Sequence, residues 1–220
     1  ALRVMYIQFD QAKDPIMKDK RVRQALNYAV DKDAIIKSLF RGYGTKLNGQ
    51  FLTPQYFGYN PDLQPYPYDP EKAKKLLAEA GYANGFKATL WSPRGRYALD
   101  IETAQAVAGQ LEKVGVSVEV RALEWATYIK QFTEKQLTPM LLAAWSVFPD
   151  ADPMLGTHLK GQPYSYLDMP AYDKLILEAR SSVDPNKRLA LYKQATALIH
   201  EDPAALYLHQ LQNIYGVNKR

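Results

Sequence analysis

The middle of the chain alternates between two hydrophobic periods, and this alternation restricts the possible folds more than any other feature. Apolar and polar residues alternate over residues 86–91 and 116–123, as they do in half-buried strands. Residues 140–145 form a continuous apolar run, which is typical of a strand buried on both faces. Residues 100–115 and 125–132 between these strands carry apolar residues at helical spacing. The order strand, helix, strand, helix, strand predicts an α/β fold with crossover helices and a parallel or mixed sheet.

Further helices are predicted on both sides of this region. Asp69 and Asp184 each precede a proline, which is the arrangement of an N-cap acid before the first helical position. Apolar spacing also predicts helices at residues 22–29 and 31–40. We therefore expect helices to surround the sheet.

Three other segments lack a helical period. Residues 42–68 are rich in Gly, Pro and Tyr, and a long ordered loop of this kind usually has a functional role. Residues 2–9 and 206–217 have the composition of strands, with no obvious partner elsewhere in the chain. Because no linker or repeat divides the sequence, we expect one α/β domain.

Composition excludes several function classes. The 28 Lys and Arg exceed the 23 Asp and Glu and give a net charge of +5. The densest basic run, residues 18–23, is interrupted by an acid and a valine, so we expect no nucleic-acid partner. The chain has no Cys, which excludes disulfides and thiolate chemistry, and its three His are scattered. We therefore expect no metal site and no cofactor.

Recognised catalytic motifs are also absent. The sequence contains no G-x-S-x-G elbow, no G-x-x-x-x-G-K-[ST] loop and no H-E-x-x-H pair. These absences favour a binding module over an enzyme.

The loops that follow the predicted strands hold the candidate site. If the strands at 86–91, 116–123 and 140–145 run parallel, their carboxyl ends share one sheet edge, where α/β folds usually bind ligands. Arginines there would neutralise anionic groups, aromatic rings would stack on the ligand, and acids would accept an amine. The candidate ligand-binding residues are Arg94, Arg96, Tyr97, Trp145, Ser146, Phe148, Asp150 and Asp152, with Gln50 and Tyr56 from the long loop.

Several segments share the residue patterns of one known family. They are residues 22–36, 68–81, 95–97, 104–106, 109–115, 184–193 and 214–217. In these motifs, which cover nearly the whole chain, the protein resembles the dipeptide/oligopeptide/nickel family of extracellular solute-binding proteins from ABC importers.

The resemblance implies a periplasmic binding protein type II-like fold, in which two lobes close over a ligand. Residues 1–220 would form a single C-terminal lobe without the N-terminal lobe, and residues 1–10 and 206–220 would be hinge segments. The implied partners are a small ligand, such as a peptide or an opine, and the membrane permease of an ABC importer. The implied protein is a monomer in the periplasm or outside the cell, and the full-length protein could carry a lipid anchor.

One position departs from the family pattern. Peptide-binding members carry an Asp three positions after the Trp that ends the strand, and this Asp receives the α-amino group of the peptide. Counted from Trp145, that position is Phe148 here. A peptide, a modified peptide, an opine, a sugar and a metal chelate therefore all stay open as ligands.

Two alternatives belong to other function classes. A hydrolase or transferase could use Asp150 and Asp152 as acid and base, which predicts turnover and perturbed carboxylate pKa values. A protein–protein module could instead use the tyrosine-rich residues 42–68, which predicts an exposed apolar patch in place of a cleft.

Overall fold

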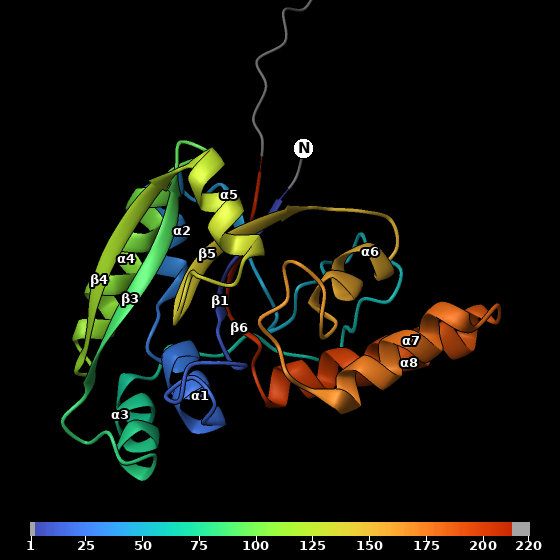
Figure 1. Ribbon diagram of the computed structural model, residues 1–220, viewed down its shortest axis with the longest axis horizontal. Coiled ribbons are helices and arrows are strands. Elements are labelled where there is room, and N and C mark those ends of the chain that lie inside the picture. The colour runs from blue at the N-terminus through green and yellow to red at the C-terminus, as the bar shows by residue number, and fades with distance from the viewer. Residues whose placement is uncertain (1–2, 213–220) are drawn as a thin grey trace, which may run out of the picture.

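The computed structural model describes residues 3–212, and its centre is a six-stranded sheet with the strand order β2-β6-β1-β5-β3-β4 (Figure 1). The strands are β1 (Arg3–Phe9), β2 (Gly44–Lys46), β3 (Phe86–Arg94), β4 (Val116–Glu124), β5 (Met140–Ser146) and β6 (Ala205–Leu211). The helices are α1 (Lys20–Tyr28), α2 (Lys32–Phe40), α3 (Pro70–Glu79), α4 (Asp100–Glu112), α5 (Trp125–Thr133), α6 (Asp152–Leu155), the 3-10 helix η1 (Gly156–His158), α7 (Pro170–Ser181) and α8 (Pro185–Glu201).

The predicted strand–helix–strand–helix–strand unit is confirmed. Strand β3 pairs in parallel with β4 on one side and with β5 on the other. Helix α4 packs against the sheet in the same apolar cluster as Leu90, whereas α5 contributes Tyr128 to the cluster that contains Leu141. The two crossover helices therefore cover opposite faces. This arrangement brings the carboxyl ends of β3, β4 and β5 to one end of the sheet.

The terminal segments have partners within the chain, so the expectation that they lack one is wrong. Strand β1 lies between β5 and β6 and is antiparallel to both, with Ile7 opposite Leu142 and Leu206. This pairing makes the sheet mixed, as the predicted fold class allows. A hinge role for residues 1–10 and 206–220 stays a prediction, and residues 213–220 lie outside the described part of the chain.

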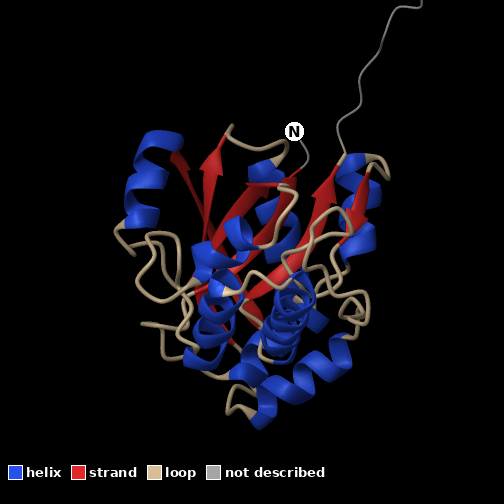
Figure 2. Ribbon diagram, turned by 90° about the vertical axis from the view of Figure 1, so that its right-hand side faces the viewer, coloured by secondary structure: helices blue, strands red, loops and turns tan. Residues whose placement is uncertain are grey.

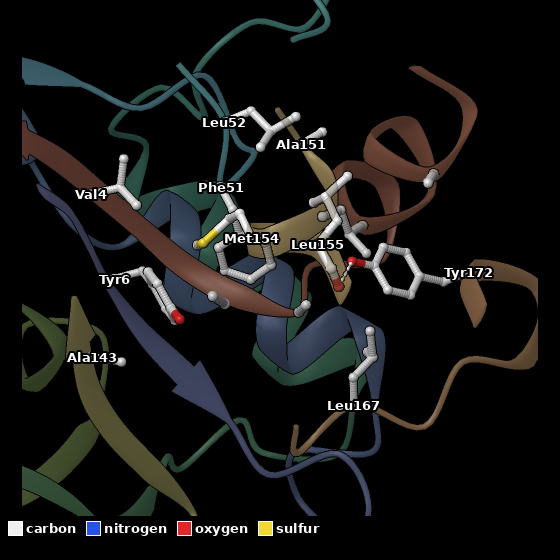
Figure 3. Packing of buried hydrophobic residues seen from close by; sticks show 14 of the residues in the cluster. Val4, Tyr6, Phe51, Leu52, Ala143, Ala151, Met154, Leu155, Leu167 and Tyr172 are labelled. Carbon is white, nitrogen blue, oxygen red and sulfur yellow. Dashed lines mark hydrogen bonds between the residues drawn. The ribbon is translucent and has the colours of Figure 1, made fainter. Parts of the chain in front are cut away.

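Two apolar clusters cover the two faces of the sheet. Helices α1 to α4 pack on one face, where Met5 and Ile7 point. Helices α5 to α8 and the long loop cover the other face, to which Tyr6 belongs, and this face is turned to the viewer in Figure 2. Figure 3 shows part of this second cluster, in which the Tyr172 hydroxyl donates to the Leu155 carbonyl over 2.7 Å. Burial of apolar surface on both faces is the main stabilising term of such a fold.

Local sequence signals explain where several helices begin. The Asp69 carboxylate accepts a hydrogen bond from the Lys72 N–H at 2.9 Å at the start of α3. Asp184 accepts from the Asn186 N–H at the same distance at the start of α8. Both acids are therefore N-caps, as predicted. Helix α7, which has no side-chain cap, and the short elements β2 and α6 were not predicted.

The loop between β2 and α3 is ordered by buried polar and apolar contacts. Gln50 is buried, and its side chain bonds the carbonyl and the N–H of Asn60 at 2.7 and 3.2 Å. Phe51 is buried in the cluster that Tyr6 shares. Gly58 has φ +101°, and a Cβ there would lie 2.7 Å from the Cβ of Ala151, so this close approach requires glycine. The loop is therefore part of the core layer.

Across residues 3–212, none of the helices has both the length and the apolar character needed to cross a bilayer.

Candidate functional site

A pocket of about 270 Å³ opens at the end of the sheet where β3, β4 and β5 finish. The residues that line it are Arg3, Arg96, Tyr97, Trp125, Ile129, Phe132, Ala144, Trp145, Ser146, Phe148 and Tyr164. Arg3 reaches the same end because β1 is antiparallel to β5 and Arg3 lies opposite Ser146. Ligands of α/β folds usually bind at this position in the sheet.

Five of the ten candidate residues line this pocket. They are Arg96, Tyr97, Trp145, Ser146 and Phe148. The first two lie in the turn after β3, and the other three lie at the end of β5 or just beyond it. The parallel pairing of the strands accounts for their convergence.

The turn after β3 is held by one buried carboxylate. Asp100 is 4% exposed, and its oxygens accept hydrogen bonds from the N–H groups of Gly95, Arg96 and Tyr97 at 3.3, 2.8 and 3.1 Å. Gly95 has φ +70°, a conformation that glycine adopts without strain. Three bonds to one carboxylate fix the backbone from which the Arg96 side chain extends.

Two guanidinium groups enter the pocket beside aromatic rings. The Arg96 Cζ lies 4.6 Å from the ring centroid of Trp125, and the Arg3 Cζ lies 5.4 Å from that of Tyr97. Arg3 Nη1 also donates to the Arg96 carbonyl at 3.4 Å. Among residues 3–212 neither guanidinium has a carboxylate within 4.0 Å. Their charge is therefore available to an anion.

Aromatic side chains form much of the wall. The rings of Trp145 and Tyr164 meet edge to face with centroids 5.1 Å apart, and those of Tyr97 and Trp125 do so at 6.2 Å. Burial raises the pKa of the Tyr97 hydroxyl, although the Ala144 backbone and Arg96 oppose the shift. The hydroxyl therefore stays protonated at neutral pH. A wall of this kind offers flat apolar contact together with a hydrogen-bond donor.

Three charged candidates lie outside the pocket lining and have other partners. Arg94 is exposed, with its Nε 3.6 Å from Oε1 of Glu124. Asp150 pairs with Arg188 on α8 at 3.0 Å, and Asp152 pairs with Arg180 on α7 at 2.9 Å. The structure therefore does not bring these two acids to the residues with which they were expected to converge.

The two candidates from the long loop have structural contacts. The Tyr56 hydroxyl donates to the Ser146 carbonyl at 3.2 Å, and burial raises the pKa of Tyr56 to about 12. Tyr56 thus holds the backbone of Ser146, which lines the pocket, without lining the pocket itself. The Gln50 side chain bonds Asn60 of its own loop.

Sequence reasoning missed part of the lining. The lining residues that were not among the candidates are Arg3, Trp125, Ile129, Phe132, Ala144 and Tyr164. Arg3 depends on the antiparallel register of β1 and β5, and Tyr164 depends on how the loop before α7 folds back. Neither relation leaves a local signal in the sequence. Over the described residues 3–212, no group of three or more His, Asp or Glu is arranged to hold a metal ion.

Comparison with a protein-family profile gives a match over most of the chain. The family is described as bacterial extracellular solute-binding proteins, family 5, middle, and it matches residues 1–166.

Individual relatives agree with this match. The dipeptide-binding protein of Escherichia coli K12 is 35% identical, and the alignment covers 94% of this chain and 40% of that protein. Heme-binding protein A of Haemophilus influenzae is 38% identical, with 90% and 38% covered. The solved structure of the periplasmic binding protein DppA from Helicobacter pylori, in complex with the peptide STSA, has a TM-score of 0.87, 29% identity and coverage of 96% and 42%. The chain therefore spans about two fifths of the length of these proteins.

Proposed function

This chain belongs to family 5 of the bacterial extracellular solute-binding proteins, and from that premise we propose that it is the C-terminal lobe of the solute-binding component of an ABC importer. The pocket at the end of the sheet would hold a peptide or a peptide-like solute. A second lobe would close over the ligand, which a membrane permease would then receive. The proposal includes a monomeric protein in the periplasm or outside the cell.

The pocket itself is the observation that carries this proposal. Guanidinium groups and aromatic rings from three separate parts of the chain converge there, at Arg3, at Arg96 and Tyr97, and at Trp145. Both ends of the described chain lie at this end of the sheet, since Arg3 is opposite Leu211 and Ser146 (Figure 1). A lobe connected through these ends would begin beside the pocket. The names of the relatives support a small organic solute, although a dipeptide and heme differ widely.

The alternatives have less support. An acid–base pair at Asp150 and Asp152 would need free carboxylates facing a cleft, whereas both groups are paired with arginines outside the pocket. A docking role for residues 42–68 would need an exposed apolar surface, whereas Phe51, Leu52 and Tyr56 of this loop are buried.

Mass spectrometry of small molecules that co-purify with the full-length protein, followed by titration of the identified solute, tests the proposal. Arg96→Ala should weaken binding about tenfold or more, since a hydrogen bond to a charged group contributes roughly 1.5–3 kcal/mol. Arg94→Ala is the matched control, because Arg94 is a neighbouring arginine that does not line the pocket. Turnover of a substrate without a retained solute, or equal binding losses in the two variants, would contradict the proposal.

A further inference from the structure

We infer that the pocket selects anionic solutes that join a carboxylate or similar group to an apolar or aromatic part, and that it does not require a free amino group. This inference rests on the proposed function and narrows the class of solute. It comes from the charges, partners and exposure of the residues that line the pocket and its rim.

The charged side chains that line the pocket within the described residues are all positive. Among the described residues that line it, Arg3 and Arg96 carry the two charged side chains and none is an acid. The acids nearest in sequence are engaged elsewhere: Asp100 accepts four backbone N–H bonds, Glu124 pairs with Arg94, and Asp150 pairs with Arg188. An anion entering the pocket therefore meets two positive charges and no competing carboxylate from the described residues.

The guanidinium groups are arranged to receive a planar anion. Arg96 lies against the Trp125 ring and Arg3 against the Tyr97 ring. A guanidinium that stacks on a ring keeps its N–H groups in its own plane, where they can bind both oxygens of a carboxylate. The bond from Arg3 to the Arg96 carbonyl joins the two arginines, although they come from different elements.

An ammonium group meets no such receptor among the lining residues within 3–212. It would lose hydration on entering the pocket and would be repelled by two guanidinium groups, with no lining carboxylate to offset either cost. The position that follows β5 by two residues is Phe148, which is 38% exposed and presents an apolar surface. The wall therefore disfavours a positive charge.

The rest of the solute would contact apolar surface. Trp145 and Tyr164 form an edge-to-face pair in the wall, and Ile129 also lines the pocket. Apolar and aromatic surface around a charged end fits a solute with separate anionic and apolar parts.

Calorimetric titration of the full-length protein with three probes tests the inference: Ala-Phe, N-acetyl-Ala-Phe and Ala-Phe-amide. We expect N-acetyl-Ala-Phe to bind at least as tightly as Ala-Phe, and the amide to bind at least about tenfold more weakly, because it lacks the charged oxygens. Loss of binding on acetylation, an amide that binds equally, or no binding of any probe would each overturn the inference. A solute found by co-purification would leave the proposed function standing in all three cases.

Variants of the arginines provide an independent readout. Arg3→Gln and Arg96→Gln should each reduce the preference for Ala-Phe over Ala-Phe-amide, whereas Arg94→Gln should leave this preference unchanged. Thermal unfolding of each variant shows whether the fold is intact. If the double variant of Arg3 and Arg96 is folded and still prefers the acid, the inference is wrong. If the double variant does not fold, the single variants are used instead. The inference is then wrong if both are folded and keep the full preference for Ala-Phe over Ala-Phe-amide.

Discussion

Two buried histidines couple the stability of this domain to pH. The imidazole of His158 lies 3.0 Å from the Met154 carbonyl and 3.3 Å from the Tyr6 hydroxyl, and it stacks on Phe51. His209 on β6 has no hydrogen-bond partner at either ring nitrogen within the described residues, and its ring lies against Phe40. Burial is the main cause that lowers the pKa of each histidine to about 4. Both side chains are therefore neutral in the folded protein at pH 7.

The low pKa values predict a loss of stability in acid. An unfolded histidine titrates near pH 6.5, so between pH 6.5 and 4 the unfolded state binds more protons than the folded state. The stabilising contribution is complete above pH 6.5 and is lost as the pH falls toward 4. The free energy of unfolding should fall less between pH 7 and pH 4.5 in His209→Leu than in the wild type. We expect the difference to be of the order of 2–3 kcal/mol. Urea unfolding at pH 7, 5.5 and 4.5 measures this free energy. If it fell equally with pH in the wild type and the variant, the low pKa of His209 would not be the cause.

A second prediction at this scale concerns Asp100, which positions Arg96 through the backbone of their turn. Asp100→Ala removes the three bonds to the turn and a fourth from the Ile101 N–H, so it should weaken binding of the co-purified solute about tenfold, with a stability loss of about 1–2 kcal/mol. Asp100→Asn keeps one acceptor oxygen and should restore part of the affinity. Asp184→Ala is the control, because it removes the N-cap of α8 outside the pocket lining. If this control loses as much affinity, Asp100 has no specific role.

At the scale of elements, the loop before α7 carries Tyr164 into the pocket, and a lysine that follows α5 holds this loop. The ammonium of Lys135, just beyond α5, donates to the carbonyls of Gln162, Pro163 and Ser165 at 2.8, 2.5 and 2.5 Å. Burial lowers the pKa of Lys135 to about 8, with a further contribution from Lys13. The charged form is therefore dominant at neutral pH and supplies a donor to each carbonyl.

Removing this lysine should loosen the pocket wall. We expect Lys135→Met to weaken solute binding about three- to tenfold, because a freed loop must be ordered again when the solute binds. Hydrogen exchange in residues 159–169 should become faster in the variant. Lys130→Met is the matched control, since Lys130 is exposed on α5. Unchanged exchange in the loop would show that the three carbonyl contacts do not restrain it.

Elements with local signals could be predicted from the sequence, whereas contacts set by long-range packing could not. Alternating strands, apolar helical spacing and Asp-Pro starts mark β3, β4, α3 and α8, and the parallel order brings five of the candidate residues together. Asp150 and Asp152 were expected there as well. They pair instead with Arg188 and Arg180, which lie 38 and 28 residues further along the chain on α8 and α7. Only the packing of α7 and α8 beside α6 brings these charges together.

At the scale of the whole molecule, the two ends of the described chain form the middle of the sheet. Strand β1 is hydrogen-bonded on both sides, to β5 and to β6, and its residues after Arg3 are buried. Strand β4 forms one edge of the sheet, and all of its residues after Val116 are exposed or half-buried. The most protected part of the fold is therefore built from segments more than 190 residues apart in the sequence.

This arrangement predicts the order in which backbone amides exchange with solvent. Amides of a strand paired on both sides open only when the sheet separates, whereas outward-facing amides of an edge strand are reached by local fraying. In the full-length protein we expect β1 and β6 to exchange in the slowest class, close to global unfolding, and β4 to exchange at least about tenfold faster. Hydrogen exchange followed by mass spectrometry on peptides of β1, β6 and β4 makes the comparison. If β1 exchanged as fast as β4, the terminal strands would be a detachable part of the sheet, and a hinge role for them would gain support over a role as its stable centre.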